Sequence, residues 1–182
     1  MSALLTGLGA IAFAAAGAGP VAAPQREASC ILDTLPSSIR QTLVEVIAQA
    51  DQARSSAALQ ENAGPIRDAA LSCVQQFEWS EDERRTALQA FLYGLRFEAS
   101  AIRLRANGLT EEQASQMFES LPSTMHEAVF GMRPMTPEET DVLQAAFEEV
   151  VDRLAGPDGN ALSEYITARA GYAHYARELS SR

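Results

Sequence analysis

The sequence predicts an all-α protein: an antiparallel or orthogonal bundle of six to seven helices after a cleavable N-terminal leader. Apolar residues recur at three- and four-residue spacing along most of the chain. Alanine, the best helix former, supplies much of the 47% hydrophobic content. No run alternates apolar and polar residues with a period of two, so we expect no sheet. We expect a leader at 1–23 and a single helical domain at 24–182.

The leader has the pattern of a secretory signal peptide. No charged side chain occurs in residues 1–25, and an apolar run at 3–16 is followed by glycines and Pro20. Small residues at Val21-Ala22-Ala23 are typical of a cleavage site, which we place after Ala23. The segment lacks a basic start and is long enough to span a bilayer, so an N-terminal membrane anchor is the alternative. Export predicts a periplasmic or secreted protein with no integral membrane domain in the mature chain.

The two cysteines, Cys30 and Cys73, are predicted to form a disulfide, because exported proteins oxidise paired thiols. Two alternatives remain open. Ala28-Ser29-Cys30 resembles the end of a lipoprotein processing box, although Glu27 occupies a position that should be apolar. Two free buried thiols are expected if the leader is not a signal peptide.

The expected helices are placed by their apolar spacing and by their capping residues. The first helix is expected at 37–57, and the second after Gly64-Pro65. The third, of roughly 27 residues, begins at a Ser80/Glu83 capping box and ends at Asn107-Gly108.

Three shorter segments follow the long helix. A short helix is expected after Thr110, with Gln113 in the capping position. Another begins at Thr136-Pro137 and ends at Gly156-Pro157. Asn160 is expected to cap the last helix, which extends to about Ser180.

The charge balance excludes several classes of function. Acidic residues outnumber basic ones by 24 to 14, giving a net charge of −10. All the basic residues except the two histidines are arginine, which is typical of a GC-rich bacterial genome. An acidic protein lacks the basic surface that nucleic acids and anionic lipids require. We therefore expect no nucleic-acid partner.

Arginine and acidic residues form two helical stripes. Arg85, Arg96 and Arg103 share one face of the long helix. This stripe is a candidate anion-binding site because the guanidinium group presents forked donors. The simpler interpretation is that it pairs with an acidic stripe elsewhere, such as the face formed by Glu138, Asp141, Glu148 and Asp152.

The motifs of common catalytic and metal sites are missing from the sequence. His126-Glu127 begins a zinc-protease helix motif, but Phe130 stands where the second histidine belongs. With two histidines in the chain, we expect no metal site and no cofactor. No phosphate-binding glycine loop or nucleophile elbow occurs. The catalytic residues, if any, are not identified by the sequence.

A methionine-rich segment is the candidate partner-binding surface. Four of the five methionines lie between Met117 and Met135, beside bulky apolar residues and three prolines. Flexible, polarizable methionines suit surfaces that bind varied apolar partners, although they also fill irregular cores. The residues proposed for contact are Met117, Phe118, Met125, Phe130 and Met132.

These observations favour an exported, non-catalytic helical module that binds a protein or an apolar small molecule. Two alternatives stay open: an enzyme whose site is built from scattered carboxylates and arginines, and a structural component of an envelope assembly. The first hypothesis predicts an exposed apolar groove, the enzyme predicts clustered acids in a polar cleft, and the structural component predicts neither.

Overall fold

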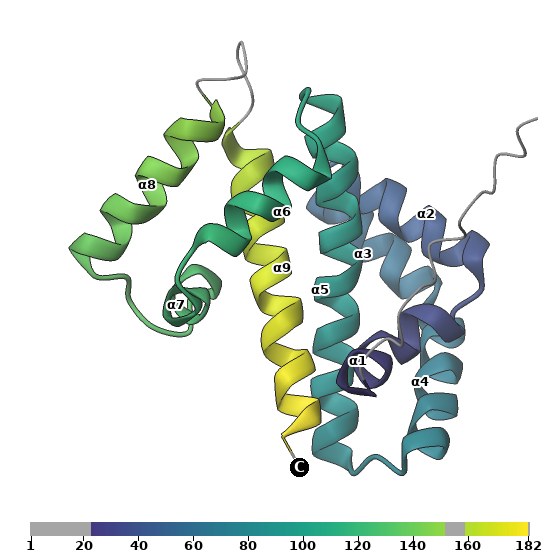
Figure 1. Ribbon diagram of the computed structural model, residues 1–182. Helices are drawn as coiled ribbons and strands as arrows, with labels where there is room; N and C mark the ends of the chain where they lie inside the picture. Colours follow the sequence, from purple (N-terminus) through teal and green to yellow (C-terminus); the bar gives the residue numbers. More distant parts are fainter. Residues whose placement is uncertain (1–22, 152–158, 182) are drawn as a thin grey trace, which may run out of the picture.

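The computed structural model describes residues 23–151 and 159–181, and every regular element in these two ranges is helical (Figure 1). The all-α prediction is therefore confirmed. The elements in chain order are α1 (Ala23–Thr34), α2 (Ser37–Ala48), α3 (Gln52–Glu61), α4 (Ala63–Phe77), α5 (Glu81–Ala106), α6 (Glu111–Ser120), the 3-10 turn η1 (Ser123–Met125), α7 (His126–Phe130), α8 (Pro137–Val151) and α9 (Gly159–Ser180). Most of the predicted leader, Asp152 and the predicted helix end at Gly156-Pro157 lie outside the described residues.

The long helix α5 and the last helix α9 form the central pair of the molecule. They run antiparallel and make the most extensive contact between any two elements (Figure 1). Helices α1 and α2 pack against α5, and α1 also contacts α4 and α9. On the other side, α6 and α7 pack against α9, while α8 packs mainly against α6. The bundle therefore has α5 and α9 as a shared axis.

The buried apolar residues form two clusters along this axis. The first contains residues of α1 to α4 and the N-terminal part of α5, with Ile31, Leu43 and Phe91 fully buried. The second contains the C-terminal part of α5 together with α6, η1 and the N-terminal half of α9, with Leu104, Met125 and Tyr165 among its members. Since α5 spans both clusters, it fixes their relative position.

The ends of α5 are where its capping residues predicted them. The Ser80 side chain accepts from the Glu83 backbone N–H, and the Glu83 carboxylate accepts from the Ser80 N–H. Gly108 follows the helix with a φ of +79°, a left-handed conformation that glycine adopts without strain. At 26 residues, α5 is about 39 Å long.

The prediction of a single helix at 37–57 is wrong, because this segment forms two helices, α2 and α3. Ala50 adopts a φ of +56°, which ends the α-helical path. Asp51 then caps α3 by accepting from the Arg54 N–H at 3.0 Å. The left-handed alanine has a conformational cost, and after the break α3 packs back against α2.

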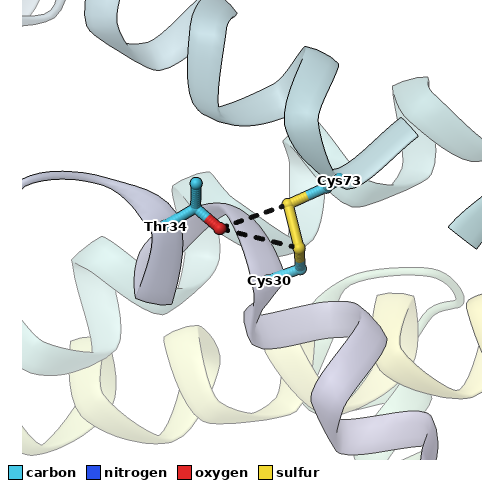
Figure 2. Close-up of a disulfide and its surroundings, with 3 residues drawn as sticks. All are labelled: Cys30, Thr34 and Cys73. Carbon is cyan, nitrogen blue, oxygen red and sulfur yellow. Dashed lines mark hydrogen bonds between the residues drawn. A yellow bond between two sulfur atoms is a disulfide. The ribbon is translucent and has the colours of Figure 1, made fainter. Parts of the chain in front are cut away.

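The predicted disulfide is present in the structure. Cys30 of α1 and Cys73 of α4 are joined, with Cα atoms 6.0 Å apart (Figure 2). The Thr34 hydroxyl lies 3.8 Å from one sulfur and 3.7 Å from the other. A disulfide sulfur carries no hydrogen, so the hydroxyl is the donor. The bond fastens the first described helix to the first core cluster.

Gly171 of α9 lies where three helices approach closely. A Cβ at this position would stand 2.5 Å from a Tyr93 ring carbon of α5 and 2.7 Å from a Phe130 ring carbon of α7. The two rings are packed edge to face with centroids 5.0 Å apart, so neither can yield independently. The glycine therefore sets the spacing of α5, α7 and α9.

We predict that Gly171→Ala lowers the free energy of unfolding by about 1–3 kcal/mol, because overpacking outweighs alanine's higher helix propensity. Gly64→Ala is the matched control, since nothing lies within 4 Å of its Cβ position; this change is expected to be neutral or slightly stabilising. Urea unfolding followed by circular dichroism measures both variants. Equal midpoints for wild type and Gly171→Ala would contradict the packing argument.

Candidate functional site

A groove of about 530 Å³ lies along α5, between α3 and α9. We call it the central groove. Its lining consists of Ile47, Ala50, Gln52, Ser55, Ser56, Leu59, Leu92, Tyr93, Arg96, Ala99, Ser100, Arg103, Ser163, Glu164, Thr167 and Ala168. The volume lies within the range of small-molecule sites in proteins. Helices form its walls, so its shape is set by the packing of the bundle.

The three arginines predicted to share a face of α5 are only partly brought together. Arg96 and Arg103 both line the central groove, whereas Arg85 does not. Arg85 is exposed and pairs with Asp82 one turn away, at 3.2 Å. Arg103 forms an ion pair with Glu164 of α9. The acidic stripe of α8 is therefore not the partner of Arg103.

Arg96 differs from its neighbours because it contacts a ring in place of a carboxylate. Its guanidinium carbon lies 5.3 Å from the centroid of the Tyr93 ring. The Tyr93 ring is itself held by Phe130 and Tyr175, with centroids at 5.0 and 5.7 Å. Within the described part of the chain, Arg96 makes no ion pair. The cation–π contact orients the guanidinium while leaving its N–H donors open.

A second groove, of about 730 Å³, lies between α6, α7 and α9. It contains aromatic rings, including Phe118 and Tyr165, and two arginines of α9, Arg169 and Arg177. Arg169 donates to Glu119 at 2.8 Å and to the Ser115 hydroxyl at 2.5 Å. These contacts bind α6 to α9 and hold the pKa of the Glu119 carboxyl below its usual range. The donors of Arg169 are therefore already used by contacts within the protein.

His126 lines the second groove and is stacked on Phe118 with ring centroids 4.3 Å apart. Burial lowers its pKa below the ordinary value of 6.5, and the positive charge of Arg177 lowers it further. Its Nε2 atom is buried and has no hydrogen-bond partner among the described residues. No group of three or more histidine, cysteine, aspartate or glutamate side chains is placed to hold a metal ion in residues 23–151 and 159–181.

The lowered pKa of His126 predicts that the stability of the folded protein depends on pH. In the folded protein its pKa is lowered, so the unfolded chain binds a proton at a higher pH than the folded chain. The contribution of His126 to the free energy of unfolding is therefore lost as the pH falls below about 6.5. His126→Phe keeps a ring against Phe118 and removes the titration, so the variant should lose less stability than wild type between pH 7 and pH 5. Urea midpoints across that range measure the difference, and parallel curves would refute it.

The methionine-rich segment does not form the contiguous apolar surface that was expected. Met117, Phe118 and Met125 are buried in the second core cluster. Phe130 is half-buried against Tyr93 and His174, and Met132 is exposed. The three buried residues fill the space between α6, η1 and α9. Their flexibility serves core packing, and Met132 is the one exposed member of the five.

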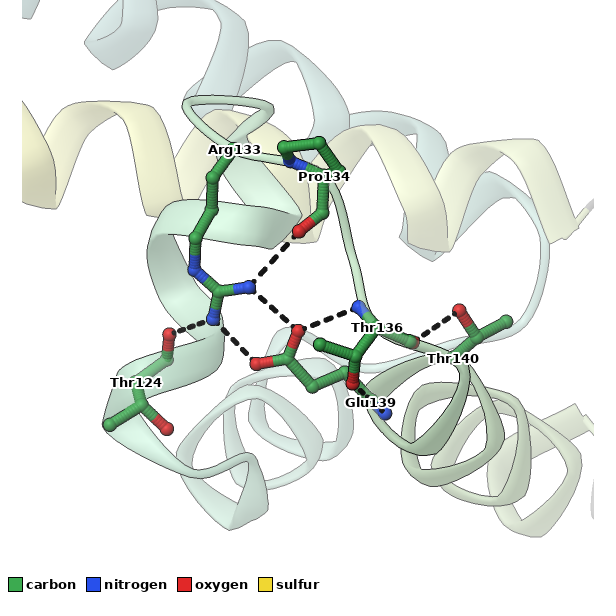
Figure 3. Close-up of polar contacts among 6 residues, drawn as sticks. All are labelled: Thr124, Arg133, Pro134, Thr136, Glu139 and Thr140. Atoms are coloured by element: carbon green, nitrogen blue, oxygen red, sulfur yellow. Dashed lines mark hydrogen bonds and ion pairs between the residues drawn. The ribbon is translucent and has the colours of Figure 1, made fainter.

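The connection from α7 to α8 is ordered by an arginine clamp (Figure 3). Arg133 donates to both carboxylate oxygens of Glu139, at 2.7 and 2.5 Å, and to the Thr124 carbonyl at 2.7 Å. The Glu139 carboxylate also accepts from the Thr136 N–H, completing the predicted start of α8. These donors, with Arg133 foremost, lower the pKa of Glu139 to about 2. The clamp is structural, since the Arg133 guanidinium and the Glu139 carboxylate bind each other and the backbone around them.

Neither a family model, a curated protein nor a solved structure matches the chain. In the described residues no helix is both long enough and apolar enough to cross a bilayer. Function therefore has to be inferred from the geometry of the grooves themselves.

Proposed function

We propose that the chain is an exported, non-catalytic helical module that binds an apolar small molecule in the central groove. The observation that carries the proposal is the groove itself: a helix-walled hollow of about 530 Å³ whose lining includes Leu59, Leu92 and Ala168. Small-molecule sites combine such apolar walls with a few placed polar groups. The central groove has that composition, with Tyr93 and Arg96 among its polar groups.

A small molecule suits the surface better than a protein partner does. The large hydrophobic side chains exposed in the described residues are Leu71 on α4, Met132 after α7 and Val142 on α8. They lie on three separate elements, whereas a standard protein interface buries roughly 800 Å² on each side around a contiguous core. The groove offers a concave site of the right size for a small ligand instead.

Binding also suits the acidic groups better than catalysis does. The pKa values of the Glu119 and Glu139 carboxyls are both lowered, in each case chiefly by a hydrogen bond from an arginine. A carboxylic acid that acts as a general acid near neutral pH needs a raised pKa. Lowered values are typical of structural ion pairs.

A tryptophan placed in the groove tests the proposal. Ser56 is exposed on α3 and lines the groove, so Ser56→Trp should obstruct it with little effect on folding. Ser72→Trp on α4 is the matched control, an exposed serine outside the groove. We expect the neutral dye Nile red to bind the wild type saturably. Ser56→Trp should reduce the affinity for the dye about tenfold or more, which corresponds to roughly 1.4 kcal/mol of binding free energy. Ser72→Trp should bind the dye as the wild type does. The proposal is overturned if the wild type does not bind the dye, or if Ser56→Trp binds it as tightly as the wild type.

Export is tested separately by intact mass. The leader pattern ending at Val21-Ala22-Ala23 predicts that protein recovered from the source cell begins near Pro24. The Cys30–Cys73 bond supports this compartment, because disulfides persist in oxidising environments. A full-length mass in the soluble fraction would contradict export and leave the groove proposal untouched.

A further inference from the structure

We infer that the ligand of the central groove is an amphipathic organic anion, whose acidic head group binds Arg96 and whose apolar body lies against the apolar side chains of α3 and α5. The inference rests on the proposed function and adds the chemical class of the ligand. A carboxylate on a short alkyl chain is the simplest member of that class.

The state of Arg96 carries the head-group assignment. Arginines elsewhere in this acidic protein are used in ion pairs: Arg40 with Glu98, Arg103 with Glu164 and Arg133 with Glu139 are examples. Among arginines with described side chains, Arg96 and Arg177 are the two that make no such pair. Arg96 lines the central groove, and its planar donors match a carboxylate in a forked geometry.

The charge of the lining distinguishes the two grooves. The central groove has Arg96 and Arg103 against the single carboxylate of Glu164, which Arg103 already binds. The second groove contains Arg177, but its lining also includes the carboxylates of Glu111 and Glu112. An anion would therefore meet a net positive lining only in the first of these two grooves. Arg177 acts instead on His126, whose protonation it opposes.

The apolar body of the ligand follows from the overall charge of the protein. A net charge of −10 repels anions at long range, so a small hydrophilic anion gains little from a single exposed arginine. Apolar area buried against Leu59 and Leu92 supplies the additional affinity. Acetate is therefore expected to compete poorly, although it carries the same head group.

The experiment compares octanoate with 1-octanol, which differ in the head group and share the alkyl chain. Each is titrated against Nile red bound to the wild type, Arg96→Gln and Arg85→Gln. Arg85 is the matched control because it is an exposed arginine of the same helix outside the groove. We expect Arg96→Gln to weaken octanoate displacement about tenfold or more and to leave octanol unchanged. Arg85→Gln should behave as wild type, and all three should give the same circular dichroism melting curve.

The outcomes separate the two claims. Equal octanoate affinity in wild type and Arg96→Gln, with dye binding still blocked by Ser56→Trp, overturns the acidic head group and preserves the proposed groove. Failure of Nile red to bind the wild type overturns both. An oligomer that Ser56→Trp dissociates, seen by sedimentation without any dye binding, would assign the groove to a second copy of the chain and also overturns both.

Discussion

Replacing Cys30 and Cys73 together with alanine is expected to lower the free energy of unfolding by about 3–4 kcal/mol. The bond closes a loop with a sequence separation of 43 residues, so its loss returns considerable entropy to the unfolded chain. Both cysteines are buried in the first core cluster, and α1 contributes Ile31 and Leu32 to the same cluster. Without the bond, α1 is held by its packing alone.

Urea unfolding followed by circular dichroism measures this loss, and wild type treated with dithiothreitol should approach the double variant. Thr34→Val is the control, because it keeps the shape of the side chain beside the disulfide and removes only the hydroxyl contacts with the two sulfurs. That change is expected to cost less than about 1 kcal/mol. Equal midpoints for wild type and the double alanine variant would show that the bond does not stabilise the fold.

The features that the sequence predicted well are those that depend on neighbouring residues. The capping residues Ser80 and Glu83 lie one turn apart, so the start of α5 is visible in a short stretch of sequence. Thr110 with Gln113 at α6 and Thr136 with Glu139 at α8 form the same reciprocal arrangement. These hydrogen bonds join residues three positions apart, so the helix starts can be predicted from the local sequence.

Helices that break without glycine or proline were missed. Ala50 takes a left-handed conformation that its side chain does not favour, so only the tertiary packing of α2 and α3 explains it. Asp51 was an available signal, since aspartate is a preferred capping residue. For α1, Ala28, Ile31 and Leu32 have helical spacing and are all buried, but the helix adjoins the predicted leader and was not recognised.

The candidate site could be anticipated only in its residue types. The arginine stripe of α5 was visible because its members lie on one helix, and two of them do line the central groove. The pairing of Arg103 with Glu164 joins residues 61 positions apart and depends on the antiparallel packing of α5 and α9. The lining of the groove comes from four helices, α2, α3, α5 and α9, so no local pattern describes it. Single-sequence periodicity contains no information on which helix faces meet.

The sequence likewise does not tell which of the methionines are buried. A pair of substitutions distinguishes a core methionine from an exposed one. Met125 is 2% exposed and Met132 is 57% exposed, although they lie seven residues apart in one segment. Met125→Ala leaves a cavity in the second core cluster, so we expect it to lower the free energy of unfolding by about 2–5 kcal/mol.

Met132→Ala removes an exposed side chain after α7 and should change the free energy of unfolding by less than about 0.5 kcal/mol. Urea midpoints for the two variants, measured on the same preparation, give the comparison directly, because both changes delete the same atoms. Similar losses in the two variants would mean that Met132 is covered in solution, and the methionine-rich segment would again become a candidate for partner binding. A large loss for Met125 alone identifies the segment as core, with its flexible side chains filling the irregular junction of α6, η1 and α9.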